Sequence, residues 1–131
     1  MMMTEEVKAY FGKQLPIFAT ADKNGNPNIG PKRTCRIYDD ETLIFNENTG
    51  GLTKANLLEN PNVAVALIDW EKLDGVRITG QVEYYSEGKY FDDCVEYAKN
   101  NGMKDPKLAG VIKIKEIFTL KSGPTAGTKI N

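Results

Sequence analysis

Short turns, rather than helices, join the first strand-like segments of this sequence. Residues 15–21 read LPIFATA, an apolar stretch typical of a strand, and the polar stretch 22–26 that follows contains Asn24-Gly25. Asn-Gly is a strong hairpin signal because both residues can adopt positive φ angles. Strands that follow one another in this way disfavour parallel, doubly wound folds, in which helices connect the strands.

The rest of the chain continues the pattern. A second strand is expected over 28–38, bulged or interrupted near Gly30-Pro31 because proline cannot donate a ladder hydrogen bond. A third over 42–46 would complete an antiparallel meander with the first two. Further strands are expected over 62–70, 76–85 and 109–120, with helices over 4–11, 53–60 and 87–101. We therefore predict a single domain over 1–131, mostly β with short helices, built as a six-stranded antiparallel barrel. The tail 122–131 is expected to be mobile unless a partner orders it.

The sequence contains no histidine. This excludes a Ser-His-Asp or Cys-His catalytic group and histidine-ligated zinc or haem within one chain. The two cysteines, Cys35 and Cys94, form no Cys-x-x-Cys motif, so we predict two free thiols and no metal site; one disulfide is the alternative. Chemistry must then come from Asp, Glu, Lys, Tyr or Cys, or from a bound cofactor.

Charge and hydropathy exclude several partners. The chain has 17 basic and 18 acidic residues, which gives no overall electrostatic reason to bind nucleic acid. Its longest apolar run, 63–68, is far shorter than the ~20 residues that span a bilayer. The N-terminus lacks the basic and apolar regions of a secretory signal. We expect a cytoplasmic protein that binds neither nucleic acid nor membrane.

The stretch 32–36, Lys-Arg-Thr-Cys-Arg, is rich in cations. Strand alternation would place the first, third and fifth of these side chains on one face. A guanidinium held at a strand can clamp phosphate, because its fork matches two phosphate oxygens. The alternative interpretation is an exposed edge strand protected by its charges.

A second stretch that suits phosphate is 48–54, Asn-Thr-Gly-Gly-Leu-Thr-Lys. A Gly-Gly turn that enters a helix presents free backbone N–H groups at an electropositive helix start. Thr53 adds a hydroxyl and Lys54 a charge, which together suit a single terminal phosphate. The spacing of a nucleoside triphosphate loop is absent. The alternative is an ordinary helix start after a flexible turn.

The order of these segments resembles the flavin-binding split barrels of the pyridoxamine 5'-phosphate oxidase-like superfamily. The matching stretches are 18–27 and 53–65, with 75–83 more weakly similar, and the resemblance spans roughly residues 5–120. It implies a split β-barrel that holds FMN in a cleft between the two protomers of a homodimer. It further implies a small FMN-dependent oxidoreductase or electron-transfer protein with a small-molecule or protein redox partner.

The resemblance also implies which residues contact the cofactor, although it indicates no catalytic residue. By position these are Arg33, Thr34 and Cys35 along the ring; Phe45, Asn46 and Glu47 near the ring and ribityl chain; and Gly51, Leu52, Thr53 and Lys54 at the phosphate turn, with Asn56 close by. Many members of the superfamily have a basic pair where this chain has Leu52-Thr53. Lys32, Arg33 or Lys54 is therefore expected to compensate.

Some activities of the superfamily are disfavoured. True pyridoxamine 5'-phosphate oxidases bind the substrate phosphate partly through an arginine-rich C-terminal segment, and this chain has no arginine beyond Arg77. One alternative is a non-catalytic flavin or haem binder that stores or senses its cofactor, although the missing histidine argues against ordinary haem ligation. The other is a deazaflavin-dependent reductase, which a large basic groove would favour and this near-neutral chain does not.

Overall fold

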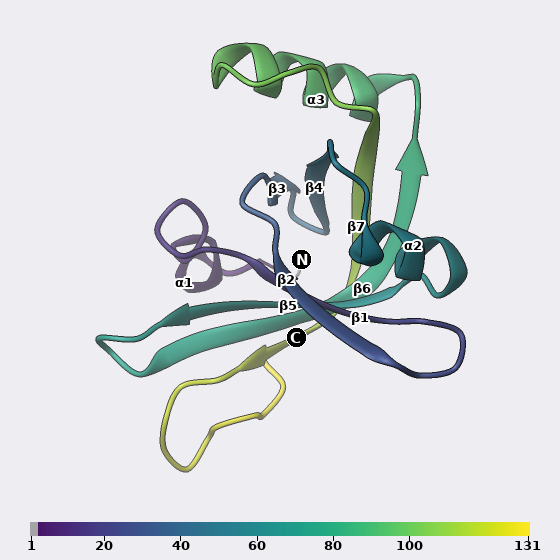
Figure 1. Cartoon of the computed structure of the whole chain (residues 1–131). Coiled ribbons are helices and arrows are strands. Elements are labelled where there is room, and N and C mark those ends of the chain that lie inside the picture. The colour runs from purple at the N-terminus through teal and green to yellow at the C-terminus, as the bar shows by residue number, and fades with distance from the viewer. Residues whose placement is uncertain (1–2) are drawn as a thin grey trace.

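The computed structural model describes residues 3–131, in which seven strands form one antiparallel sheet. The sheet order is β2-β1-β5-β6-β7-β4-β3, and α2 and α3 interrupt the succession of strands. Figure 1 shows α3 at the top of the molecule, where β6 leads into it, and the turn of the long β5–β6 hairpin away from it at the left. The elements are α1 (Glu5–Lys8), β1 (Ile17–Ala21), β2 (Pro27–Pro31), β3 (Arg36–Asp39), β4 (Thr42–Glu47), α2 (Leu52–Glu59), β5 (Asn62–Asp69), β6 (Asp74–Tyr85), α3 (Lys89–Asn100) and β7 (Leu108–Thr119).

The mostly-β antiparallel fold with short helices is confirmed, but it has seven strands and not six. The expected strand over 28–38 divides in two, because β2 ends at Pro31 and β3 begins at Arg36. Between them the chain turns, and the Cys35 backbone N–H donates to the Lys32 carbonyl at 3.0 Å. Pro31 has no N–H with which to continue the ladder. The predicted alternation of side chains over 32–36 is therefore wrong, since residues 32–35 lie in a turn.

The expected meander is also wrong. β1 and β2 pair at one edge of the sheet, whereas β3 and β4 pair at the other edge, with three strands between them. β1 pairs on its other side with β5, and β4 pairs with β7. The two hairpins that are neighbours in sequence therefore do not pair with each other in the sheet, although they meet in the core, where Phe18 packs against Phe45.

The core lies on the inward face of the sheet. Phe18 and Phe45 are fully buried and pack edge to face, with ring centroids 5.1 Å apart. Phe45 also packs against Gly110, where an added Cβ would overlap the Phe45 ring. Gly110 therefore serves close approach between β4 and β7. The completely buried aliphatic side chains around the two rings include Leu43, Val65, Leu67, Ile78, Ile112 and Ile117.

Each helix is fixed by an identifiable contact. Thr4 caps α1 as its sequence predicts, since its hydroxyl accepts from the Val7 backbone N–H at 3.2 Å. α2 is held against β1 by Asn56, whose side-chain amide donates to the Thr20 hydroxyl at 3.1 Å. α3 buries Cys94 and Ala98, and Cys94 packs with side chains of β4 and β7.

The tail 122–131 folds back along β7. The Thr119 backbone donates to Thr128 at 2.9 Å, and the Gly127 backbone donates to Thr119 at 2.8 Å. Lys129 forms an ion pair with Glu116 at 3.6 Å. The tail thereby pairs with the part of β7 that extends beyond the end of β4.

Among residues 3–131, no helix is long and apolar enough to cross a membrane. Met1 and Met2, which belong to the N-terminal stretch expected to lack a secretory signal, lie outside the described residues.

Candidate functional site

The two segments that were predicted to bind phosphate meet at one buried carboxylate. Glu47, at the end of β4, has a side chain that is only 1% exposed. Its Oε2 accepts from the Lys32 ammonium at 3.0 Å and from the Gly50 backbone N–H at 3.3 Å. Its Oε1 accepts from the Tyr84 hydroxyl at 3.0 Å. Glu47 therefore joins the turn 32–35, the loop 48–51 and β6.

Tyr84 acts as a hydrogen-bond donor to Glu47. Burial, together with the neighbouring Glu47 carboxylate, raises the pKa of the Tyr84 phenol. The hydroxyl therefore stays protonated and can keep donating to Glu47.

The start of α2 contacts β2 directly. The Asn28 side-chain amide donates to the Thr53 hydroxyl at 3.2 Å. Gly30 faces the same hydroxyl, and a Cβ built on Gly30 would lie 3.9 Å from it. β2 and the start of α2 therefore lie side by side, and Glu47 links the turn 32–35 to the loop that leads into α2.

The cations of this region differ in whether they are paired. Lys32 pairs with Glu47, and Arg36 pairs with Asp93 at 2.6 Å. The Arg33 and Lys54 side chains make no hydrogen bond or ion pair with any other residue in the range 3–131. Arg33 is exposed and Lys54 is half-buried. These two cations are thus available to an anion.

The start of α2 is also available. Its N-cap is Gly51, with φ 88°, which provides no capping side chain. The first N–H groups of a helix have no partner within the helix, so here they keep their capacity to donate. Two unpaired cations, an uncapped helix start and the Thr53 hydroxyl are a donor set that fits a phosphate group, such as that of FMN.

Several residues expected along the flavin ring have other partners within the chain. The Thr34 hydroxyl accepts from the Asn46 backbone N–H at 3.1 Å, and Asn46 donates its amide to the Cys94 carbonyl at 2.9 Å. Cys35 and Phe45 belong to the core. That these residues contact a cofactor stays a prediction, and such a contact would come through their backbone.

Sequence reasoning missed two residues at this site, Asn28 and Tyr84. Strand alternation could have found Asn28, because it shares a face of β2 with Gly30. No local signal marks Tyr84, whose bond to Glu47 links positions 37 apart. Asn48, in the loop before α2, has a buried side-chain oxygen with no hydrogen-bond partner among the described residues.

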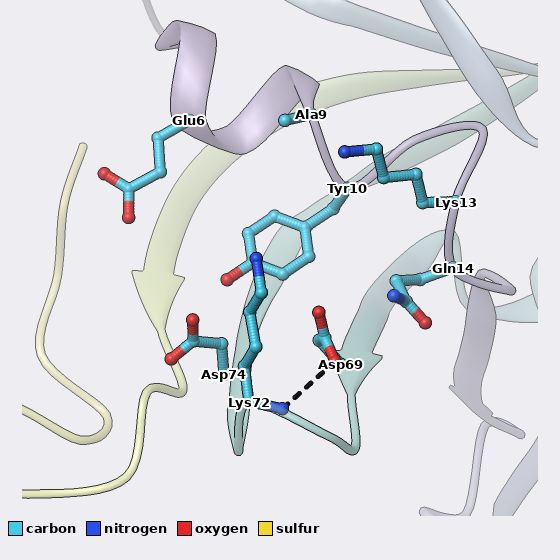
Figure 2. A pocket seen from close by; sticks show the side chains of 8 residues that line it. All are labelled: Glu6, Ala9, Tyr10, Lys13, Gln14, Asp69, Lys72 and Asp74. Atoms are coloured by element: carbon cyan, nitrogen blue, oxygen red, sulfur yellow. Dashed lines mark hydrogen bonds between the residues drawn. The ribbon is translucent and has the colours of Figure 1, made fainter.

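A hollow elsewhere in the molecule lies outside this site. It has a volume of about 240 Å³ and lies between the α1 region and the β5–β6 hairpin (Figure 2). The Tyr10 ring lies in its centre, and burial together with nearby carboxylates, Asp74 first, raises the pKa of Tyr10. None of the predicted cofactor-binding residues lines it.

A second hollow, of about 440 Å³, lies on the outward face of the sheet. Small residues of β1, β5 and β6, including Ala19, Ala64 and Gly80, line it. Thr79 lines it too, and the Thr79 hydroxyl is buried without a hydrogen-bond partner in the described part of the chain.

Comparison with known proteins agrees with this architecture. The family model described as pyridoxamine 5'-phosphate oxidase matches residues 3–121. This chain belongs to that family. Like other members of the pyridoxamine 5'-phosphate oxidase family, it is built as a split barrel.

Three proteins that are similar to this chain in sequence or structure are described next. The crystal structure of HupZ from Group A Streptococcus is 43% identical, with a TM-score of 0.88 over 96% of this chain and 100% of that one. The uncharacterized protein MJ0282 of Methanocaldococcus jannaschii is 37% identical over 98% of this chain and 87% of its own length. An FMN-binding protein from Syntrophomonas wolfei has a TM-score of 0.78 over 92% of this chain and 87% of that one. Its identity is 22%, so this likeness shows the fold alone.

Proposed function

We propose that this protein binds FMN at the start of α2 and acts as a small FMN-dependent oxidoreductase or electron-transfer flavoprotein. The proposal rests on one observation: within residues 3–131, the side chains of Arg33 in the turn 32–35 and of Lys54 at the uncapped start of α2 have no partner, and Glu47 joins that turn to the loop that leads into α2. A phosphomonoester carries a charge of about −1.5 to −2 at neutral pH, which two cations and a helix start complement.

Each group at the site has a distinct role in this proposal. The Arg33 fork and the Lys54 ammonium bind phosphate oxygens, and the Thr53 hydroxyl and the first N–H groups of α2 donate to the same anion. The flavin, when bound, supplies the electron chemistry. A chain without histidine can therefore support redox chemistry through its cofactor.

Oxidation of vitamin B6 is not part of the proposal. No arginine follows Arg77 in the sequence, and the C-terminal tail is hydrogen-bonded along β7. Residues 78–131 therefore supply no arginine for a substrate phosphate.

We further propose a homodimer in which a second copy of the chain covers the outward face of the sheet and reaches the FMN site across β2, because Ile29 lies on that face while Asn28 and Gly30 face the start of α2. Strand register aligns Ile29, Ala19, Ala64 and Thr79 in a row across β2, β1, β5 and β6. Ile29 is 72% exposed, and the Thr79 hydroxyl has no partner among residues 3–131. An exposed apolar face with a buried, unpartnered hydroxyl is typical of a surface that a partner covers.

The first test is a fluorescence titration of the flavin-free protein with FMN. We expect the wild-type protein to quench FMN fluorescence, and Arg33→Ala with Lys54→Ala to weaken binding at least about 100-fold. Charged hydrogen bonds contribute ~1.5–3 kcal/mol each, which gives this magnitude for two. The matched control is Lys13→Ala with Lys72→Ala, which removes two lysines that line the hollow in Figure 2 and should leave the affinity unchanged.

Failure of the wild-type protein to quench FMN, or an unchanged affinity in the Arg33/Lys54 variant, would contradict the proposal. Mixing the flavin-loaded protein with a reduced nicotinamide cofactor then separates turnover from storage. Bleaching of the flavin absorption supports a redox role, whereas an unchanged spectrum favours the non-catalytic binder.

A further inference from the structure

Glu47, Lys32, Tyr84 and the Gly50 backbone form one hydrogen-bonded cluster, the Glu47 cluster. We propose that Glu47 is a positioning residue that withholds Lys32 from the phosphate and so sets the charge of the site to suit one phosphomonoester. This inference rests on the proposed function, because it concerns the same anion site, and it assigns Glu47 and Lys32 a role other than cofactor contact.

The geometry makes Lys32 unavailable. The Lys32 ammonium lies 3.0 Å from Glu47 Oε2, and the two side chains are 14% and 1% exposed. If Lys32 turned toward a ligand, Glu47 would keep a buried charge without its counter-ion, which is strongly unfavourable. Tyr84 and the Gly50 backbone donate to the same carboxylate and hold it in place.

The same contacts fix the loop that leads into α2. Gly50 donates to Glu47 Oε2 directly before the Gly51 N-cap of the helix. Glu47 therefore fixes the loop next to the helix start while it neutralises Lys32. Arg33 and Lys54 then keep their charges free of any partner among residues 3–131, and these two charges together match that of a phosphomonoester.

Glu47→Gln removes the charge but keeps the shape of the side chain: its one amide oxygen can still accept from Gly50, while its amide N–H can donate to the Tyr84 hydroxyl oxygen. In this variant Lys32 loses its counter-ion and becomes available to phosphate. Riboflavin lacks the phosphate of FMN. We therefore expect the ratio of the riboflavin Kd to the FMN Kd to rise about fivefold, which is the effect of one modest ion pair between Lys32 and the phosphate. We also expect FMN binding to become more sensitive to salt. The ratio compares two ligands within one variant, so a loss of stability alone would not change it.

The double variant Lys32→Met with Glu47→Gln removes both charges together. Replacing a buried pair by neutral groups is often tolerated, so this variant is expected to fold even if the single variant does not. Its ratio should return to the wild-type value. The matched control is Asp93→Asn, which breaks a different ion pair, the one between Asp93 on α3 and Arg36 on β3. This variant should leave the ratio unchanged.

An unchanged or lower ratio in Glu47→Gln would overturn the inference. A ratio below the wild-type value in the double variant would also overturn it, because it would mean that Lys32 itself binds the phosphate.

Thermal unfolding in inorganic phosphate, compared with chloride at equal ionic strength, separates this inference from the proposed function. If phosphate stabilises the wild-type protein but FMN does not bind, the flavin proposal fails. Stabilisation by phosphate should then be greater in Glu47→Gln than in wild type, and the absence of that difference overturns the inference. No response to either ligand overturns both.

Discussion

Cys35 shows how one residue's environment decides its chemistry. It lies in the turn before β3 and is 5% exposed. Burial raises the pKa of the Cys35 thiol to about 12, although Arg36 and Lys32 nearby act in the opposite direction. Burial also raises the pKa of Cys94, whose thiol donates to the Phe45 carbonyl at 3.6 Å. Both are free thiols, as the sequence predicts, and both favour the neutral form.

We expect neither cysteine of the folded protein to react with a thiol reagent at pH 8. At that pH nearly all of Cys35 is protonated, because its pKa lies well above the pH, and both side chains are buried. A disulfide-exchange assay should count two thiols in denaturant and none before unfolding. Rapid labelling of Cys35 in the folded state would contradict this account of its environment.

At the scale of elements, Arg36 fastens α3 to the sheet. Its guanidinium binds Asp93 at 2.6 Å and stacks on the Tyr97 ring at 3.7 Å, and both residues belong to α3. The same group donates to the Asn46 side chain at 3.2 Å and to the Thr34 carbonyl at 2.9 Å. Arg36 was one of the cations considered for phosphate, and the structure gives it a tethering role instead.

Arg36→Lys should lower the free energy of unfolding by about 1–3 kcal/mol. Lysine keeps the charge but cannot stack on Tyr97 while it donates to three acceptors. Urea unfolding measures the effect. Lys8→Met, which removes the exposed ion pairs of Lys8 with Glu5 and Asp40, is the control and should change stability by less than about 1 kcal/mol. Equal losses in the two variants would contradict the tether.

At the scale of the whole molecule, α2 covers one face of the sheet and leaves the other face exposed. Asn56 and Leu57 of α2 are buried, and Asn56 binds Thr20 on the inward side of β1. The adjacent residues Ala19 and Ala21 line the outward hollow. The cation site thus lies at one end of α2, while the opposite face of the sheet stays open for the proposed second copy. A cytoplasmic location stays a prediction of the sequence.

Ala64→Arg should convert the proposed homodimer to a monomer, since it places a charged side chain in the middle of the outward face. Sedimentation at micromolar concentration measures the mass. Glu96→Arg, on the exposed side of α3, is the control and should leave the dimer intact. A wild-type monomer, or a dimer that survives Ala64→Arg, would contradict the proposed interface.

The sequence by itself determined the type and approximate limits of most elements. Asn24-Gly25 predicted the first hairpin, Thr4 the start of α1 and Pro31 the interruption of the second strand. These features depend on the φ angles, hydrogen-bonding groups and side-chain periodicity of a few adjacent residues, which a sequence states directly.

Only the tertiary structure decided which strands pair and which charges meet. The first two hairpins are adjacent in sequence, yet they lie at opposite edges of the sheet because β5, β6 and β7 pack between them. Lys32, Arg33 and Lys54 are all cations in the sequence, and only the buried Glu47 distinguishes the first from the other two. Such pairings depend on the packing of segments far apart in the chain, and no local pattern of residues encodes them.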